Sequence, residues 1–369
     1  LRSLFPSPDT AVHDIARPWT ERLVRPGAVA ALAGVLWAAV RHPRALAAMF
    51  GVVLHRYRRS PKAVPRALVT VALACAHARD LERSGRPCHI HAHYATYPAL
   101  AAWVCHRLLG VSYSFTAHAH DIYVDQTMLA DKIAAARFVV TISAYNRDLL
   151  AGIADGATPV EVVHCGIDTA RYPFRARPIP ADGPVRALCV ASLQEYKGHA
   201  VLLQALALGG AAERIHLDLI GDGVLRESLE ALAIELGIAD RVQFLGSRTE
   251  SDVAQALAGA DLFVLPSVVA ADGQMEGLPV ALMESLACGI PTVSTALSGI
   301  PEIVLDGVTG MLSTPGDAAD LHSTLLRMLD SGAAAVDYGV AGRKLVEGEF
   351  DIRDTSVALL ELFERYVGN

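Results

Sequence analysis

Two glutamates, Glu276 and Glu284, frame the start of a predicted helix over Val280–Cys288. Pro279 suits the first position of this helix, and Gly289 suits its exit. A helix N-terminus offers free N–H groups and the positive end of a dipole to an anion such as a phosphate. Gly277, just before the helix, lets such a ligand approach the backbone closely.

Glu284 lies about 7.5 Å beyond Pro279 along the helix axis, at 1.5 Å per residue. A carboxylate accepts two hydrogen bonds from a cis-diol, so a ribose attached to the bound phosphates could reach Glu284. Glu276, on the preceding loop, would face the group beyond the phosphates. The plainer interpretation is that two surface glutamates bracket an ordinary helix.

Further polar and glycine residues follow predicted strands. Lys197 lies in the first loop of the second half, close after Ser192, where a point charge could neutralise a phosphate. Gly221 and Gly223 form a turn that lets the backbone approach a ligand closely. Solvated loop lysines and simple strand-to-helix turns are common, so each of these patterns is weak by itself.

Histidines gather after two strands of the first half, with His89, His91 and His93 alternating along one and His118 and His120 following the next. Side chains at i and i+2 share a strand face, so this pattern could supply metal ligands for a hydrolase. Alternatively, His89, His91 and His120 hydrogen-bond the strand ends and loops. A role in a cleft without metal is a third interpretation, mostly for His118.

The surrounding elements predict an α/β protein. Short apolar runs alternate with amphipathic stretches, which is typical of βα units around a parallel sheet. The first series of predicted strands is Cys88–His91, Ser112–Thr116, Phe138–Ile142 and Val160–His164. The second series is Arg186–Ala191, His216–Ile220, Val242–Leu245, Leu262–Leu265 and Thr292–Ser294. The proline-rich stretch 171–184 between the two series predicts a linker between domains. We therefore expect two Rossmann-like domains that face each other across a cleft. Ligands of such parallel sheets bind at the carboxyl ends of the strands.

The N-terminal region predicts two or three helices over residues 28–78. Its most apolar stretch, Ala28–Val40, is about half the length that crosses a bilayer. Ten Lys and Arg residues lie within residues 17–66, against the single acid Glu21. These helices could lie on an anionic membrane surface, or Ala28–Val40 is buried and the arginines form a solvated face.

The composition sets broader limits. A chain of 369 residues is long enough for two core-bearing domains. A net charge of −7 and a pI of about 6.1 argue against a general nucleic-acid binder. Six cysteines at wide spacings, with no C-x-x-C pair, favour a reduced, cytoplasmic compartment. The chain begins at Leu1 without a signal peptide, which suggests that a natural N-terminus is missing.

Taken together and in order, these motifs resemble glycosyltransferase family 4, whose members are retaining enzymes of the GT-B fold. In the second half they are Ser192-x(4)-Lys197-Gly198, Gly221-Asp-Gly223, Val242-x-Phe244-Leu245-Gly246, Glu276-x(7)-Glu284 and Ser298-Gly-Ile-Pro-Glu302. In the first half, His89-Ile-His-Ala-His93, Ser114-Phe-Thr-Ala-His118-Ala-His-Asp121 and Val163-His-Cys-Gly-Ile-Asp168 are similar to its exopolysaccharide branch, including colanic-acid-type enzymes.

The resemblance implies a role for each matching residue. Lys197 would stabilise the departing nucleotide diphosphate, and Glu276 would bind hydroxyls of the donor sugar. Gly277, Leu278, Pro279 and Val280 would present backbone groups to the sugar and phosphate. Glu284 would hold the ribose, and His118 would line the cleft beside the transferred sugar. The loop around Gly246 would recognise the base through its backbone.

The resemblance also implies the reaction: transfer of a hexose, with retention, from a UDP- or GDP-sugar to a polysaccharide or lipid-linked glycan. The family's usual mechanism is substitution on the same face of the sugar, in which the leaving phosphate helps to deprotonate the acceptor hydroxyl. In this mechanism the protein mainly supplies electrostatic stabilisation and positions the substrates. No metal or other cofactor is expected, consistent with the lack of an Asp-x-Asp motif in the donor half. The expected domains are 1–178 on the acceptor side and 179–349 on the donor side, with a C-terminal helix in 350–369, from about Asp354 to Val367, packing back on the first.

Two departures from the family matter. Many relatives carry arginine where this chain has Ser192, so Lys197 is expected to be the principal cation on the diphosphate. Nothing before Arg17 resembles the family's opening strand and glycine-rich loop, so the first strand and helix of the N-terminal domain are expected to be absent. These departures motivate an alternative, a non-catalytic nucleotide-sugar binding protein.

Overall fold

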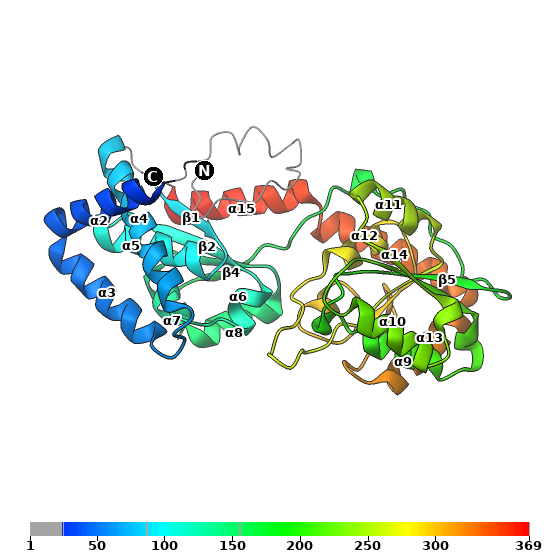
Figure 1. The fold of residues 1–369 in the computed structure, drawn as a ribbon. Helices are drawn as coiled ribbons and strands as arrows, with labels where there is room; N and C mark the ends of the chain where they lie inside the picture. The colour runs from blue at the N-terminus through cyan, green and yellow to red at the C-terminus, as the bar shows by residue number, and fades with distance from the viewer. Residues whose placement is uncertain (1–23, 25, 86–87, 155, 369) are drawn as a thin grey trace. The chain divides into compact units, whose positions relative to one another are not determined.

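A computed structural model describes residues 24, 26–85, 88–154 and 156–368. The chain forms two compact units, each with its own parallel sheet (Figure 1). Unit 1 holds the described residues of Leu1–Thr141, Leu149–Glu161 and Glu364–Asn369; unit 2 holds Ile142–Asp148 and Val162–Phe363. The domain boundary expected at 178/179 stays a prediction. The prediction that an opening strand and helix are absent concerns residues outside the described part of the chain. The same holds for four residues of the basic segment: Arg17, Glu21, Arg22 and Arg25.

Within the described residues, the first sheet has four strands in the order β1-β2-β3-β4. They are β1 (Ile90–His93), β2 (Tyr113–Ala117), β3 (Val139–Thr141) and β4 (Val160–Val162). The pairs β1–β2 and β2–β3 are parallel. All four strands were predicted, but β1 begins two residues later than expected, because Cys88 and His89 precede the backbone ladder with β2.

Helices pack against this sheet and against one another. Those of the first half are α2 (Ala28–Arg41), α3 (Pro43–Tyr57), α4 (Val64–Ser84), α5 (Tyr97–Leu109), α6 (Ala119–Tyr123), α7 (Leu129–Ala135) and α8 (Ala144–Ile153). Residues 28–78 therefore form three helices, because Pro43 and Pro65 each occupy the first turn of a new one. A side chain at Gly34 would overlap the backbone of Ala76, so α2 lies very close to α4.

The second sheet has six strands in the order β10-β9-β8-β5-β6-β7, with every adjacent pair parallel. Its strands are β5 (Val185–Val190), β6 (Ile215–Ile220), β7 (Val242–Gly246), β8 (Leu262–Leu265), β9 (Thr292–Thr295) and β10 (Met311–Ser313). Five of them match predictions. The sequence analysis missed β10, since three residues are too few to show a strand pattern.

The helices of the second half include α9 (His199–Ala207), α10 (Arg226–Glu235), α11 (Glu250–Gly259), α12 (Val280–Ala287), α13 (Ala318–Asp330) and α14 (Ala335–Glu349). Short 3₁₀ turns lie at η1 (Thr169–Arg171), η2 (Glu195–Lys197), η3 (Gly210–Arg214), η4 (Ala239–Arg241), η5 (Ile300–Glu302) and η6 (Gly332–Ala334). The final helix, α15 (Ile352–Val367), starts two residues before the predicted one. In its last turn, which belongs to unit 1, the Tyr366 hydroxyl donates to Glu161 at 2.5 Å.

Two predictions about α12 need correction. Pro279 is the residue before the helix, with an extended ψ of 121°, and Val280 is the first helical residue. The helix ends at Ala287 rather than Cys288. Among the described residues, no helix combines the length and apolar character needed to cross a bilayer.

Candidate active site

The loops after β5 and β8 bring Lys197 and Glu276 together. A side chain at Gly198, whose φ is +74°, would overlap the carbonyl of Pro266, so the two loops lie in direct contact. The Lys197 ammonium forms an ion pair with the Glu276 carboxylate. Their side chains are 15% and 12% exposed, so the pair is largely shielded from water. Two predicted site residues 79 positions apart thus touch.

Burial sets the ionisation of Lys197. Removal from water lowers the pKa of this lysine to about 8, and the nearby Cys189 thiol opposes the shift. At neutral pH the side chain therefore still carries a proton, and it can act as a cation toward a phosphate.

We expect the affinity for a nucleoside diphosphate to fall as the pH rises from 7 to 9. A lysine with a pKa near 8 is mostly protonated at pH 7 and mostly neutral at pH 9, so affinity should drop about tenfold if only the charged form binds. Calorimetric titration with UDP or GDP across this range measures the change. Lys197→Arg should remove the pH dependence, because arginine stays protonated. An unchanged affinity at pH 9 would contradict this role.

Close backbone contacts gather the next loops beside Lys197. A side chain at Gly221 (φ +143°) would overlap the carbonyl of Ala191, and one at Gly223 would overlap that of Leu193. The Gly221 N–H donates to the carbonyl of Gly246, at the end of β7, at 3.0 Å. Ser192 is exposed between these contacts. The predicted residues Ser192, Gly221, Gly223 and Gly246 therefore line neighbouring loops at one edge of the sheet.

The loop before α12 is held by its own backbone. The Gly277 carbonyl accepts from the Gly299 N–H at 3.1 Å, which joins this loop to the one after β9. Glu276, Gly277, Leu278 and Pro279 are buried, while Val280 is exposed at the start of the helix. The loop is thus fixed in place where α12 begins.

Glu284 is paired with a residue that the sequence analysis did not select. The Tyr172 hydroxyl donates to a Glu284 carboxylate oxygen at 2.7 Å. Burial raises the pKa of the Glu284 carboxyl, and the hydrogen bond from Tyr172 opposes that shift. One carboxylate oxygen is thereby committed to the protein, and Tyr172 fixes the direction of the other.

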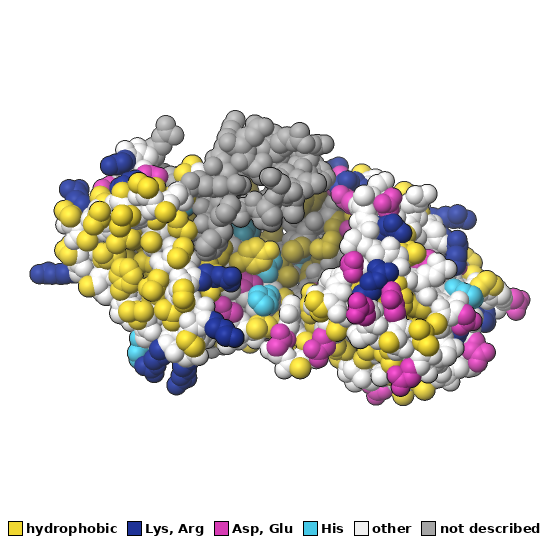
Figure 2. Space-filling model, in the orientation of Figure 1, with side chains coloured by type: hydrophobic (Ala, Val, Ile, Leu, Met, Phe, Trp, Pro, Cys, Tyr) yellow, Lys and Arg dark blue, Asp and Glu magenta, His cyan; other side chains and the backbone are white. Residues whose placement is uncertain are grey.

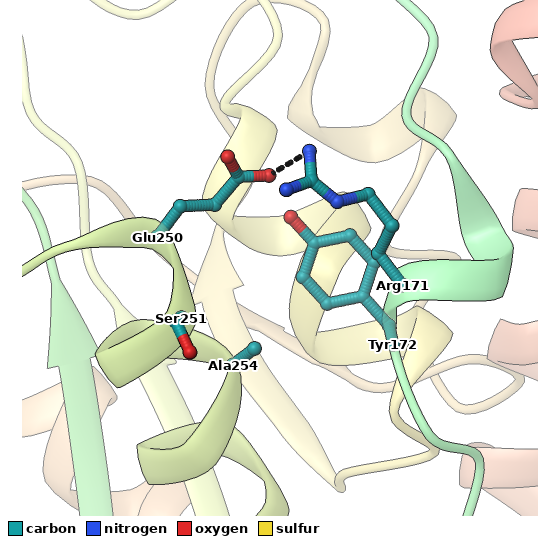
Figure 3. A pocket seen from close by; sticks show the side chains of 5 residues that line it. All are labelled: Arg171, Tyr172, Glu250, Ser251 and Ala254. Atoms are coloured by element: carbon teal, nitrogen blue, oxygen red, sulfur yellow. Dashed lines mark ion pairs between the residues drawn. The ribbon is translucent and has the colours of Figure 1, made fainter. Parts of the chain in front are cut away.

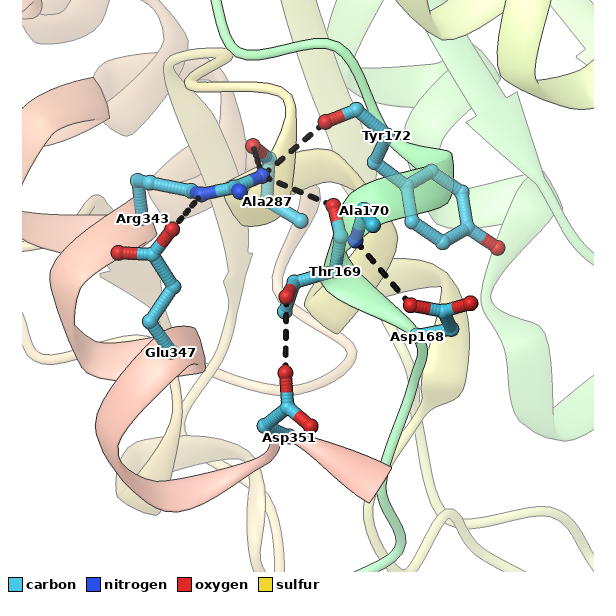
Figure 4. A network of polar contacts seen from close by, with 8 residues as sticks. All are labelled: Asp168, Thr169, Ala170, Tyr172, Ala287, Arg343, Glu347 and Asp351. Atoms are coloured by element: carbon cyan, nitrogen blue, oxygen red, sulfur yellow. Dashed lines mark hydrogen bonds and ion pairs between the residues drawn. The ribbon is translucent and has the colours of Figure 1, made fainter. Parts of the chain in front are cut away.

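Arg343 holds the Tyr172 segment in place (Figure 4). Its guanidinium donates to the carbonyls of Thr169, Tyr172 and Ala287 at 3.2, 3.0 and 2.9 Å. The Thr169 hydroxyl also donates to Asp351 at 2.8 Å, which ties η1 to the start of α15. No motif surrounds Arg343 in the sequence, so only the fold identifies it as a support for Glu284.

A pocket of about 280 Å³ lies beside this pair. It is lined by Arg171, Tyr172, Glu250, Ser251 and Ala254 (Figure 3). Arg171 and Glu250 form an ion pair at 2.5 Å across it. The pocket therefore joins the start of α11, which follows the Gly246 loop, to the hydroxyl that orients Glu284.

Tyr172→Phe is expected to weaken nucleotide binding about three- to tenfold without unfolding the protein. The change removes only the hydroxyl that orients Glu284, at a cost of about 0.7–1.4 kcal/mol. Titration with UDP or GDP measures the loss, and the matching 2′-deoxynucleotide supplies the control. If Glu284 binds the ribose diol, the penalty should shrink for the deoxynucleotide; an equal penalty would contradict that role.

The histidines of unit 1 divide into two groups. His89 bonds through its two ring nitrogens to Ser112 and Ser114, at 2.9 and 2.7 Å. His91 bonds in the same way to Ser114 and Thr116, at 2.7 and 2.9 Å. Both rings thus join strand β1 to β2, as the hydrogen-bonding interpretation expects. Within the described ranges no group of three or more His, Cys, Asp or Glu side chains could hold a metal, so the proposed hydrolase site is not assembled.

His118 is placed differently, at the end of β2. Its backbone N–H donates to one carboxylate oxygen of Asp121 at 2.9 Å, and the other oxygen accepts from the backbone N–H of Ala95. Its ring lies 4.8 Å from that of Tyr94. Burial lowers the pKa of His118, so its imidazole is neutral at pH 7. Its predicted place beside the sugar of a donor stays a prediction.

Comparison with known proteins agrees with these motifs. Residues 20–171 match the family described as Glycosyltransferase Family 4, and residues 173–345 match Glycosyl transferases group 1. The chain belongs to glycosyltransferase family 4. Its second half carries the group 1 match and holds Lys197, Glu276 and Glu284.

The relatives within this family include exopolysaccharide enzymes. The amylovoran biosynthesis glycosyltransferase AmsK of Erwinia amylovora is 37% identical over 213 residues, covering 57% of this chain and 51% of its own. The putative colanic acid biosynthesis glycosyltransferase WcaL of Escherichia coli K12 is 40% identical over 170 residues, covering 45% and 41%. The chain thus spans about half the length of these curated relatives.

Solved structures of similar fold include sucrose-phosphate synthase of Thermosynechococcus elongatus, with a TM-score of 0.69 and 22% identity over 81% of this chain and 78% of the other. The Anabaena protein HepE, in its complex with UDP-glucose, has a TM-score of 0.66 and 19% identity over 95% and 94%. The expected GT-B fold is confirmed.

Proposed function

We propose that this family 4 member is a retaining glycosyltransferase that moves a hexose from a UDP- or GDP-sugar to a polysaccharide or lipid-linked glycan. The contact between Lys197 and Glu276 carries the proposal, because it places a largely shielded cation against a carboxylate in the loop that leads into α12. The Lys197 ammonium can neutralise a diphosphate, and the Glu276 carboxylate can accept hydrogen bonds from sugar hydroxyls. The relatives that act in amylovoran and colanic acid biosynthesis favour an exopolysaccharide acceptor.

In the proposed reaction, the nucleoside occupies the region of Tyr172 and Glu284, and the diphosphate reaches the N-terminus of α12. Lys197 neutralises charge that develops on the leaving diphosphate, which is where electrostatic stabilisation acts on the transition state. Glu276 turns from Lys197 to the donor sugar's hydroxyls. The leaving phosphate takes the acceptor's proton, so the protein supplies position and charge, with no metal or other cofactor.

A thermal-shift screen against UDP, GDP, ADP and their sugar conjugates, with and without metal, tests this proposal. A ligand at a hundredfold excess over its dissociation constant stabilises the folded state by about 2.7 kcal/mol. We expect one nucleotide series to raise the melting temperature independently of metal. The absence of a shift with every nucleotide would contradict a donor site.

A second candidate, a nucleotide-sugar binding protein without transfer activity, rests on Ser192. This exposed hydroxyl stands where the resemblance to the family implies an arginine. Donor binding with neither transfer nor donor hydrolysis would favour it, and Ser192→Arg would then be the variant in which to look for restored turnover.

We also propose that the protein works in the cytoplasm, at the inner face of the cell membrane. Helix α2 carries a stripe of exposed apolar side chains along one face: Val29, Leu32, Leu36 and Val40, which are 84%, 63%, 59% and 80% exposed. Exposed Arg44, Arg58, Arg59 and Lys62 follow on and after α3. Figure 2 shows apolar side chains gathered over this part of unit 1, with Lys and Arg at its margins. Apolar area next to basic charge matches an anionic lipid surface.

Leu32→Glu combined with Leu36→Glu is expected to abolish sedimentation with phosphatidylcholine vesicles that contain phosphatidylglycerol. The two positions are already exposed, so the fold should persist. Val224→Glu, at a position 82% exposed in unit 2, is the matched control and should leave sedimentation unchanged. Binding that ignores both phosphatidylglycerol and salt would contradict an electrostatic membrane contact.

A further inference from the structure

Tyr94 combines two unusual properties at the end of β1. It is a non-glycine residue with a φ of +78°, a conformation that costs energy for residues with a Cβ. The residue is nevertheless 53% exposed, so burial of the ring does not compensate for the energy of this conformation. Such strain with an exposed aromatic side chain indicates a binding role.

Hydrogen bonds on both sides hold Tyr94 in this conformation. Its N–H donates to the Thr116 carbonyl at 2.9 Å. The next N–H, of Ala95, donates to the buried carboxylate of Asp121, which also accepts from His118. One carboxylate therefore fixes the backbone on which both Tyr94 and His118 stand.

The groups around the ring define the ligand. The His118 ring lies 4.8 Å from the Tyr94 ring at 45°, and the His93 imidazole is near enough to be repelled by a charged His118. Burial lowers the pKa of both histidines, so at neutral pH each offers one hydrogen-bond donor and one acceptor and no positive charge. Neutral donors and acceptors beside an aromatic face suit an uncharged ring with hydroxyl groups, and they do not suit a phosphate.

We propose that Tyr94, with His93 and His118, is a binding site for a pyranose ring of the acceptor glycan. The proposal rests on the proposed function, and it adds an acceptor residue to it. Tyr94 stacks on the apolar face of the sugar, while the imidazoles bond its hydroxyls. The other groups assigned to the donor, Lys197, Glu276 and Glu284, belong to unit 2, whereas this cluster belongs to unit 1. His118 is the one member that the resemblance places beside the transferred sugar, and the acceptor hydroxyl attacks that same sugar, so His118 can lie beside both.

Saturation-transfer NMR with methyl glucoside, galactoside and mannoside, compared among Tyr94 variants, tests the proposal. Tyr94→Phe keeps the ring and should bind like the unaltered protein, whereas Tyr94→Ala should lose at least fivefold in affinity. Tyr94→Gly should lose binding equally but melt at the same or a higher temperature, since glycine adopts a positive φ without strain. A merely structural tyrosine would give the opposite result, a lower melting temperature.

Hydrolysis of the donor, measured in the same variants, separates this proposal from the proposed function. We expect the KM for the UDP- or GDP-sugar to remain unchanged in Tyr94→Ala. A raised donor KM would assign the ring to the donor sugar and overturn the proposal, as would equal binding of the glycosides by all variants or no binding by the unaltered protein. Failure of the proposed function itself would show as a protein that binds no nucleotide at all.

Discussion

Lys197→Met is expected to lower the rate of sugar transfer by about 100- to 1,000-fold, the usual effect of removing one group that stabilises developing negative charge. Methionine keeps the length and apolar character of the buried stem, so the variant should fold. Initial rates at saturating donor measure the effect on turnover. A Lys197→Met rate within threefold of the unaltered protein would contradict the role of Lys197.

Glu276→Gln tests the other half of the ion pair. Lys197 then remains in a largely buried place without its carboxylate, which should lower stability by about 3 kcal/mol in addition to slowing transfer. Combining Glu276→Gln with Lys197→Met should restore much of this stability but none of the activity. If the stability losses simply added, the two residues would not form a coupled pair.

Gly221→Ala and Gly198→Ala should each destabilise unit 2 by more than about 3 kcal/mol, well above the usual effect of a point substitution. Each glycine has a positive φ, and at each a Cβ would overlap a backbone carbonyl, of Ala191 and of Pro266 respectively. Neither carbonyl can move without disturbing the loops that carry the site. Urea denaturation measures the loss, and donor affinity should fall with it.

Two other glycines provide controls. Gly237 also has a positive φ, of +69°, but open space surrounds it, so Gly237→Ala should cost only about 1 kcal/mol. Gly152, in α8, has an ordinary helical φ and open space, and Gly152→Ala should stabilise by about 0.5–1 kcal/mol. A similar cost at Gly221 and Gly237 would show that the close approach of the loops matters little.

The elements of the fold were largely predictable because they depend on local patterns. Apolar runs bounded by turns located nine of the ten strands in the described part of the chain, and α12 was placed to within one residue. The failures have local reasons too. β10 is too short to show a period, and β1 is displaced because His89, which reads as part of an alternating strand, bonds through its side chain rather than through the backbone ladder.

The candidate site was predictable only as separate pieces. The types and spacing of Lys197, Glu276 and Glu284 marked them as groups for phosphate, sugar and ribose. No motif indicated Tyr172 or Arg343. Tyr172 lies in a stretch predicted as a linker, and Arg343 lies within an ordinary helix. Tyr94 was also missed, because a positive φ at a tyrosine cannot be inferred from its neighbours in the sequence.

The sequence by itself determined which residues could do chemistry and that each follows a strand of a parallel sheet. Tertiary structure decided which of them meet: β8 pairs with β5, although two strands separate them in the chain, and so Lys197 touches Glu276. It also decided that Tyr172 orients Glu284, 112 residues away. Periodicity reports only whether a residue faces the core or the solvent. The order of strands follows from how the whole apolar surface is buried, which no local pattern records.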